Sequence, residues 1–205
     1  MGRRSDHSRE ELGALALDAA RRIVEQEGLR GLTARRVARD IGYTIGTIYN
    51  HFENLDDLIM QMNGQTLDAL YAALTERPLD GGPEKALRSL MDGYLAFTSR
   101  HPKFWAALIE FQPAEGQGLP DWHGEKILRL LGLIERALAP LLAHSTEAQR
   151  LHRARVIWSS LHGICSQEAS GKIAATESAA AMADTLLTYL LAGLKAEAAG
   201  VASTV

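Results

Sequence analysis

The chain has 205 residues, of which 46% are hydrophobic and 23% are charged, and this composition excludes a disordered or fibrous protein. The net charge of −3 argues against a protein that binds nucleic acid over its whole surface. The longest apolar runs, such as residues 185–194, are too short and too interrupted to span a bilayer, and the N-terminus has no apolar signal core, so we expect a cytoplasmic protein that contacts no membrane.

Helical periodicity is nearly continuous along the chain, and no alternating strand pattern bounded by hairpin turns is present. We therefore predict an all-α fold with about nine helices. In the first helix, Leu12, Ala16, Ala19 and Ile23 share one face, and Gly28 ends it. Proline- and glycine-containing breaks then separate the later helices, at residues 78–83, 101–102, 113–120, 144–145 and near 171.

The most informative segment runs from Thr33 to Phe52. Thr33 is predicted to cap a short helix, Gly42 to form a turn with positive φ, and Thr44 to cap the next helix. In that next helix Ile48 and Phe52 face the core, and we expect the other side chains to point outward: Ile45, Gly46, Thr47, Tyr49, Asn50 and His51. A helix with short donors and acceptors outward and no acidic residue is typical of major-groove recognition.

Other interpretations of this segment are weaker. A helical hairpin with a glycine turn is common in α-bundles, but the order of the whole segment and the arginine-bearing arm before it favour DNA. A helical enzyme is disfavoured because no GxSxG, P-loop, HExxH or Cys/His cluster occurs, so we expect no catalytic site, cofactor or metal. The single Cys165 excludes an intrachain disulfide. A non-DNA-binding helical adaptor, or a helical protein that only binds a small molecule, is the remaining alternative.

Residues 12–70 resemble the DNA-binding domain of the TetR family of transcriptional regulators. The resemblance rests on residues 28–33, 37–38, 41–42, 46–52 and 55–58. It implies that Thr33, Arg35, Thr44, Gly46, Thr47, Tyr49 and His51 lie on or near DNA, with the tyrosine and the histidine on the phosphate backbone. The family often has Lys near the start of its fourth helix, where this chain has Glu53, Asn54 and Leu55. We therefore expect the affinity to depend more on Arg3, Arg4 and Arg35.

The resemblance also implies the function and the domain organisation. Residues 1–53 are expected to form a three-helix helix-turn-helix domain with an N-terminal arm, and residues 54–205 a helical bundle for ligand sensing and dimerisation. The expected protein is a homodimer that binds double-stranded, palindromic operator DNA and is released by a small apolar or amphipathic effector. Members of the family usually repress transcription, and the residues of this chain do not exclude activation. Residues 101–105 and 156–164 are similar to a TetR C-terminal class with a Trp, His, Gly signature.

The second half offers candidates for a ligand pocket, which needs an apolar lining with a few polar anchors. These candidates are the larger apolar or polarisable side chains of the bundle: Met91, Tyr94, Phe97, Trp105, Leu108, Ile109, Phe111, Trp122, Leu130, Ile134, Trp158, His162 and Cys165. About half of them are expected to be plain core. A stripe at helical spacing, Leu186, Tyr189, Leu190 and Leu194, is predicted to form the dimer interface, although the same stripe would also suit the protein's own core.

Overall fold

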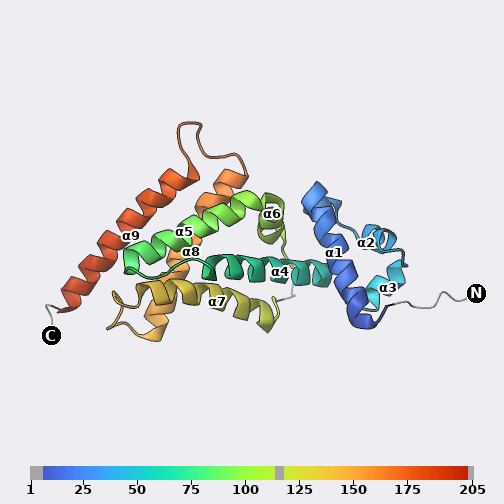
Figure 1. The fold of residues 1–205 in the computed structure, drawn as a ribbon, viewed down its shortest axis with the longest axis horizontal. Coiled ribbons are helices and arrows are strands. Elements are labelled where there is room, and N and C mark those ends of the chain that lie inside the picture. The colour runs from blue at the N-terminus through green and yellow to red at the C-terminus, as the bar shows by residue number, and fades with distance from the viewer. Residues whose placement is uncertain (1–6, 114–117, 203–205) are drawn as a thin grey trace, which may run out of the picture. The chain divides into compact units, whose positions relative to one another are not determined.

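The computed structural model describes residues 7–113 and 118–202. These residues form nine α-helices and one short 3-10 turn and contain no strand, which confirms the predicted all-α class (Figure 1). The helices in chain order are α1 (Arg9–Glu27), α2 (Ala34–Asp40), α3 (Ile45–Tyr49), α4 (Leu55–Thr75), α5 (Pro83–Arg100), α6 (Pro102–Glu110), α7 (Asp121–Leu138), α8 (Glu147–Ala169) and α9 (Ala179–Ala202). Each predicted break falls between two of them.

Local signals explain where several helices begin and end. Ser8 and Glu11 form a capping box at the start of α1, and Gly28 ends that helix with a φ of 75°. Proline occupies the first position of α5 and of α6, where its missing N–H costs nothing. In the described part of the chain, no helix is long and apolar enough to cross a membrane.

The chain forms two compact units. The first unit contains residues 1–67 and 101–119, and the second contains residues 68–100 and 120–205. The helix α4 is continuous and supplies residues to both units, and α6 belongs to the first unit although it lies between α5 and α7 in the sequence. We predicted one boundary, after residue 53, and did not predict that residues 101–119 would belong to the first unit.

The core of the first unit is built from small and medium side chains, which allow its helices to approach closely. Ala16, Ala19, Ala20 and Ala38 are all buried there. The start of α4 and one face of α6 complete it with Leu58, Ile59, Met62, Phe104 and Ala107. The second unit packs α5, α7, α8 and α9 around a core dominated by larger aliphatic side chains.

Candidate functional site

The segment from α2 to α3 has the local geometry that the sequence predicts. Thr33 Oγ1 accepts a hydrogen bond from the backbone N–H of Arg36, and Thr44 Oγ1 accepts one from that of Thr47, both at 3.2 Å. Gly42, with a φ of +77°, forms the turn between the two helices. Both caps and the glycine turn are therefore confirmed, and they fix α3 relative to α2.

The outward surface of α3, which we call the recognition face, consists of Gly46, Thr47, Tyr49 and Asn50. Tyr49 is 48% exposed, and Gly46 and Asn50 are also exposed. The Thr47 hydroxyl lies 2.9 Å from the Thr44 hydroxyl, so the two threonines form a small polar group at the start of the helix. This face offers an aromatic hydroxyl, an amide and one aliphatic hydroxyl, and it carries no acidic side chain.

Two of the predicted outward residues contact the core of their own unit instead of standing free. Ile45 is half-buried and packs against the core of the first unit. His51 is half-buried, its ring lies edge-on to that of Phe52 at 4.6 Å, and it covers Gly13 of α1. A Cβ at Gly13 would lie 2.2 Å from His51 Nε2, so only glycine fits under the ring. Sequence reasoning missed Gly13, although a glycine within a helix is a signal for such close approach.

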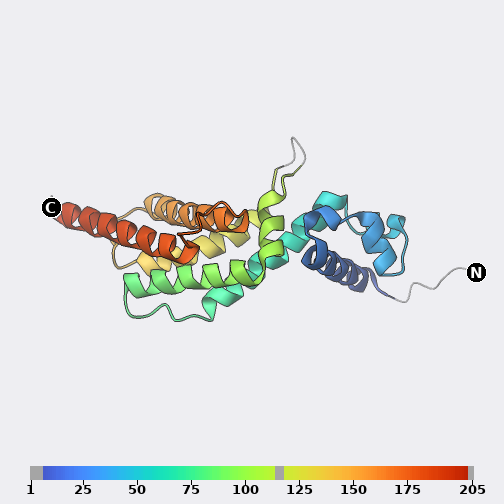
Figure 2. The ribbon, with the colours of Figure 1, turned by 90° about the horizontal axis from the view of Figure 1, so that it is seen from above.

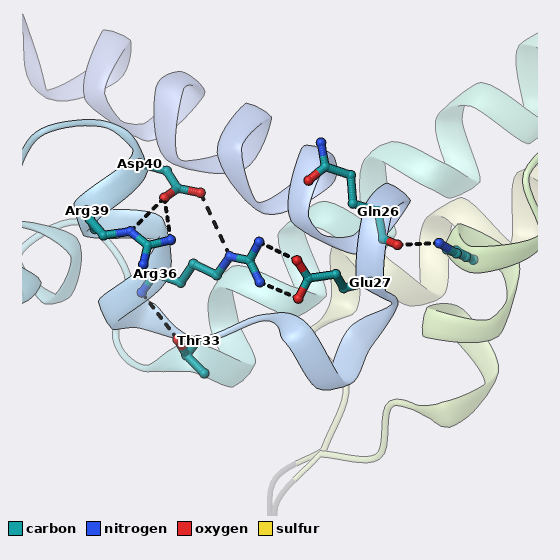
Figure 3. A network of polar contacts seen from close by, with 7 residues as sticks. Gln26, Glu27, Thr33, Arg36, Arg39 and Asp40 are labelled. Carbon is teal, nitrogen blue, oxygen red and sulfur yellow. Dashed lines mark hydrogen bonds and ion pairs between the residues drawn. The ribbon is translucent and has the colours of Figure 1, made fainter.

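An ion-pair network holds α2 against the end of α1 (Figure 3). The Arg36 guanidinium makes two contacts with the Glu27 carboxylate, and its Nε lies 4.0 Å from Asp40 Oδ2. The hydrogen bonds from Arg36 hold the pKa of the Glu27 carboxyl below its ordinary value. Arg36 is thus engaged within the protein, whereas the adjacent Arg35 is exposed.

The helix α6 is anchored to α1 within the first unit. Lys103 Nζ donates a hydrogen bond to the carbonyl oxygen of Gln26 at the C-terminal end of α1. The guanidinium of Arg21 lies 4.4 Å above the ring of Phe104, which is buried in the core of this unit. The candidate pocket residues on this segment therefore belong to the unit that contains the helix-turn-helix: Trp105, Leu108, Ile109 and Phe111.

A surface hollow of about 370 Å³ joins the recognition face to the N-terminal end of α1. It is lined by His7, Ser8, Arg9, Leu12, Thr47, Asn50 and His51. Arg9 Nη2 donates to the carbonyl oxygen of Asn50 at 3.4 Å. A guanidinium beside exposed amide and hydroxyl groups suits a phosphate group. Two further predicted DNA-binding residues, Arg3 and Arg4, lie outside the described residues.

The second unit contains a narrow cavity of about 20 Å³ between α4, α5, α7 and α8. Five of the candidate pocket residues line it: Met91, Tyr94, Leu130, Ile134 and Trp158. The remaining lining is aliphatic and consists of Leu74, Leu87, Leu90, Leu133, Ile157 and Leu161. The candidate list did not include these residues, because leucine and isoleucine at helical spacing are indistinguishable from ordinary core in the sequence.

The polar groups beside this cavity are neutral. Tyr94 Oη lies 3.1 Å from His162 Nδ1, and the Tyr94 ring meets Trp158 edge-on at 5.1 Å. Burial lowers the pKa of His162 and raises the pKa of Tyr94 well above its ordinary value. Thr98 Oγ1 lies 3.8 Å from Cys165 Sγ, and burial raises the pKa of that thiol to about 11.

Four other candidates of the second unit do not line the cavity: Phe97, Trp122, His162 and Cys165. Phe97 is buried on α5. Trp122 is half-buried near the start of α7, where the ammonium of Lys126 lies 6.0 Å from its ring centroid. Lys126 and Arg129 of α7 both pair with Asp68 of α4, at 2.5 and 3.6 Å. These ion pairs attach the second half of α4 to α7.

A larger groove of about 560 Å³ lies between α8 and α9, which run side by side (Figure 2). Three residues of the predicted dimer stripe line it: Tyr189, Leu190 and Leu194. Tyr189 is 72% exposed and Val156 of α8 is 44% exposed, so this groove shows unusual apolar surface. The fourth, Leu186, is half-buried and does not line the groove. Among the described residues no group of three or more His, Cys, Asp or Glu could hold a metal ion.

Comparison with known proteins supports this organisation. The chain matches the family model for bacterial regulatory proteins of the tetR family over residues 16–62, and the model for the tetracyclin repressor-like C-terminal domain over residues 87–190. It is 24% identical to YobS of Bacillus subtilis, an uncharacterized HTH-type transcriptional regulator, over 150 residues, which are 73% of this chain and 74% of YobS.

Two solved structures show the same fold. A TetR transcriptional regulator from Rhodococcus sp. RHA1 has a TM-score of 0.69 at 18% identity, over 90% of this chain and 98% of that chain. The regulator FadR from Bacillus subtilis, in complex with stearoyl-CoA, has a TM-score of 0.66 at 13% identity, over 88% of this chain and 98% of that chain. These matches do not test the signature of Trp158, His162 and Gly163, which stays a prediction.

Proposed function

Because this chain belongs to the TetR family of DNA-binding transcriptional regulators, we propose that it is a homodimeric repressor released from a palindromic operator by a small apolar or amphipathic ligand. The observation that carries this proposal is the recognition face of α3, held at a defined angle by the glycine turn and two threonine caps. A rigid helix with exposed hydrogen-bonding groups and no acidic side chain suits the floor of the major groove.

In the proposed complex, Thr47, Tyr49 and Asn50 contact base edges and phosphates. Arg35 is exposed on α2 and supplies a bidentate phosphate contact. Thr33, Thr44 and Gly46 bring backbone amides close to the DNA, and Arg3 and Arg4 extend the contact through the arm. Ile45 and His51 act mainly by supporting this surface, since both pack on the core of the first unit.

The groove between α8 and α9 is the proposed dimer interface. The exposed Tyr189 and Val156 beside the half-buried Leu190 give it the apolar surface that a second copy would cover, whereas Leu194 is already buried in its own subunit. Dimeric helix-turn-helix proteins read two half-sites in successive major grooves about 34–36 Å apart, and we propose the same for this dimer. The operator should then be a palindrome.

The effector is proposed to bind at the cavity of the second unit. Ligand pockets in proteins enclose about 300–1,000 Å³, so a ligand would have to part the helices around the present cavity of about 20 Å³. The structural neighbour FadR binds stearoyl-CoA, and the acyl chain of that ligand supports an effector with an apolar part. Because α4 places Leu58 and Met62 in the core of the first unit and Leu74 in the cavity lining, its displacement by ligand would reach the helix-turn-helix.

A mobility-shift titration against the DNA upstream of the protein's own gene, with a scrambled duplex as control, tests the proposal. Salt-dependent binding to the first duplex alone, and a palindrome selected from random sequences, are the expected results. The double variant Thr47→Ala/Tyr49→Ala should bind about 10-fold or more weakly, because two contacts are lost. Its melting temperature and mass in solution should equal those of the wild type. A matching loss of folding, or unchanged binding, would contradict the contact role.

A further inference from the structure

The cavity of the second unit combines an apolar wall with the side chain of Tyr94. Among the described residues that line it, none is charged, and Tyr94 brings the only hydroxyl. Tyr94 Oη lies 3.1 Å from Nδ1 of His162, which lies two turns before the end of α8 and does not itself line the cavity. The ring of Trp158, which lines the cavity and carries an indole N–H donor, meets the ring of Tyr94 edge-on. Among the lining side chains, the Tyr94 hydroxyl is therefore the group that can both donate and accept a hydrogen bond.

We propose that the effector is an uncharged molecule with an apolar body and one hydroxyl or carbonyl group, and that the Tyr94–His162 pair recognises this group. The inference rests on the proposed function, since it assumes that this cavity is the effector site. The inference goes further than the proposed function because it names the chemistry of the ligand. It predicts a neutral ligand and excludes carboxylates and other charged amphiphiles.

The pair suits both kinds of neutral group. A phenol hydroxyl both donates and accepts, and a neutral imidazole donates from one ring nitrogen and accepts at the other. The direction of the hydrogen bond between Tyr94 and His162 depends on the tautomer of His162. By exchanging the tautomer, the pair can therefore donate to a carbonyl oxygen or accept from a hydroxyl.

A carboxylate would find no counter-ion at this position. No charged residue of the described chain lines the cavity, and three cations of α5, α7 and the segment after α4 are engaged elsewhere: Arg77 donates to the carbonyl oxygen of Ser89 at 2.7 Å, Arg88 pairs with Asp184, and Lys126 pairs with Asp68. Burial lowers the pKa of His162, which favours its neutral form over the cationic one. An anion entering this apolar space would lose its hydration without gaining an opposite charge, which disfavours binding.

Three eight-carbon probes test the inference on the full-length protein: 1-octanol, octan-2-one and octanoate. Isothermal titration at about pH 8 keeps the octanoate carboxyl ionised, since a carboxyl titrates near pH 4. We expect the alcohol and the ketone to bind, and octanoate to bind at least about 10-fold more weakly.

The variant Tyr94→Phe removes one hydroxyl and keeps the ring against Trp158. It should weaken binding of 1-octanol by about 5- to 10-fold. The control Tyr71→Phe removes a hydroxyl from the same unit and keeps the ring under the Arg129 guanidinium, 4.3 Å away. Its affinity for 1-octanol should not change. Equal melting temperatures of the two variants would show that both are folded.

Tighter binding of octanoate than of 1-octanol would overturn the inference, and so would failure of all three probes to bind. An unchanged affinity of Tyr94→Phe would remove the pair from recognition of the ligand. The mobility shift without ligand is measured on the same preparations. Specific DNA binding together with a preference for octanoate would overturn only the ligand class, whereas absence of specific DNA binding would overturn the proposed function itself.

Discussion

The two functional regions of this protein are built on different scales. The recognition face and its supports come from one continuous segment, residues 33–52, together with a close contact from α1. The cavity of the second unit takes its lining from four helices whose residues are spread from Leu74 to Leu161. Backbone geometry therefore controls the first region, whereas side-chain volume controls the second. Each should fail in its own way when it is altered.

The largest effect is expected where side-chain volume matters most. Leu130 is 1% exposed and lines the cavity, so Leu130→Ala should lower the free energy of unfolding by about 2–5 kcal/mol. Leu128→Ala makes the same chemical change on the same helix at a side chain that is 47% exposed, and it should cost no more than about 0.5 kcal/mol. Urea denaturation measures both. Similar losses for the two variants would contradict the packing that the structure assigns to α7.

The next effect concerns close approach in the first unit. A Cβ at Gly13 would lie 2.2 Å from His51 Nε2, so Gly13→Ala should destabilise the first unit by about 1–3 kcal/mol and weaken DNA binding. Gly132→Ala is the matched control, because that helical glycine has no atom within 4 Å of the added Cβ. It should be neutral or stabilise slightly, by about 0.5–1 kcal/mol.

The double variant Gly13→Ala/His51→Ala shows whether contact with the His51 ring causes the loss of stability in Gly13→Ala. Adding His51→Ala to Gly13→Ala removes the clash and should restore part of the stability, as measured by the melting temperature. The stability loss of the double variant is compared with the sum of the losses of the two single variants. A loss larger than this sum would contradict the described contact between Gly13 and the ring of His51.

The same contrast explains what the sequence could predict. Thr33, Gly42 and Thr44 act through contacts within three residues or through their own backbone angles, and each is visible as a local pattern. Gly13 acts through a residue far along the chain, so its role required the structure. The cavity-lining leucines carry no local signal at all. The aromatic and polar candidates Tyr94 and Trp158 stood out only because their types are less common in plain core.

The sequence also could not predict that α6 packs in the first unit. Phe104 and Ala107 have the spacing of any amphipathic helix, and that spacing shows which face is buried but not what covers it. The contact of Lys103 with the carbonyl of Gln26 depends equally on the tertiary arrangement. Trp105, Ile109 and Phe111 were placed in the same candidate set as Tyr94 for this reason.

The smallest effect on stability is expected from a change that separates capping from DNA contact. Asp is as good an N-cap as Thr, so Thr44→Asp should keep the free energy of unfolding within about 0.5 kcal/mol of wild type, whereas Thr44→Ala should lose about 1 kcal/mol. Thr146 caps α8 through the same kind of hydrogen bond, and Thr146→Asp serves as the control for the added charge. Urea denaturation and a mobility shift are measured on all three.

If Thr44 lies near a phosphate as proposed, the carboxylate of Thr44→Asp repels the DNA backbone, and binding should fall by about 10-fold or more while the helix stays capped. The loss should grow as the salt concentration decreases, because screening weakens the repulsion at high salt. Thr146→Asp should leave DNA binding unchanged. Should Thr44→Asp bind the operator like wild type, Thr44 acts only as a cap, and the DNA contacts of this region would have to come from Thr47, Tyr49 and Asn50.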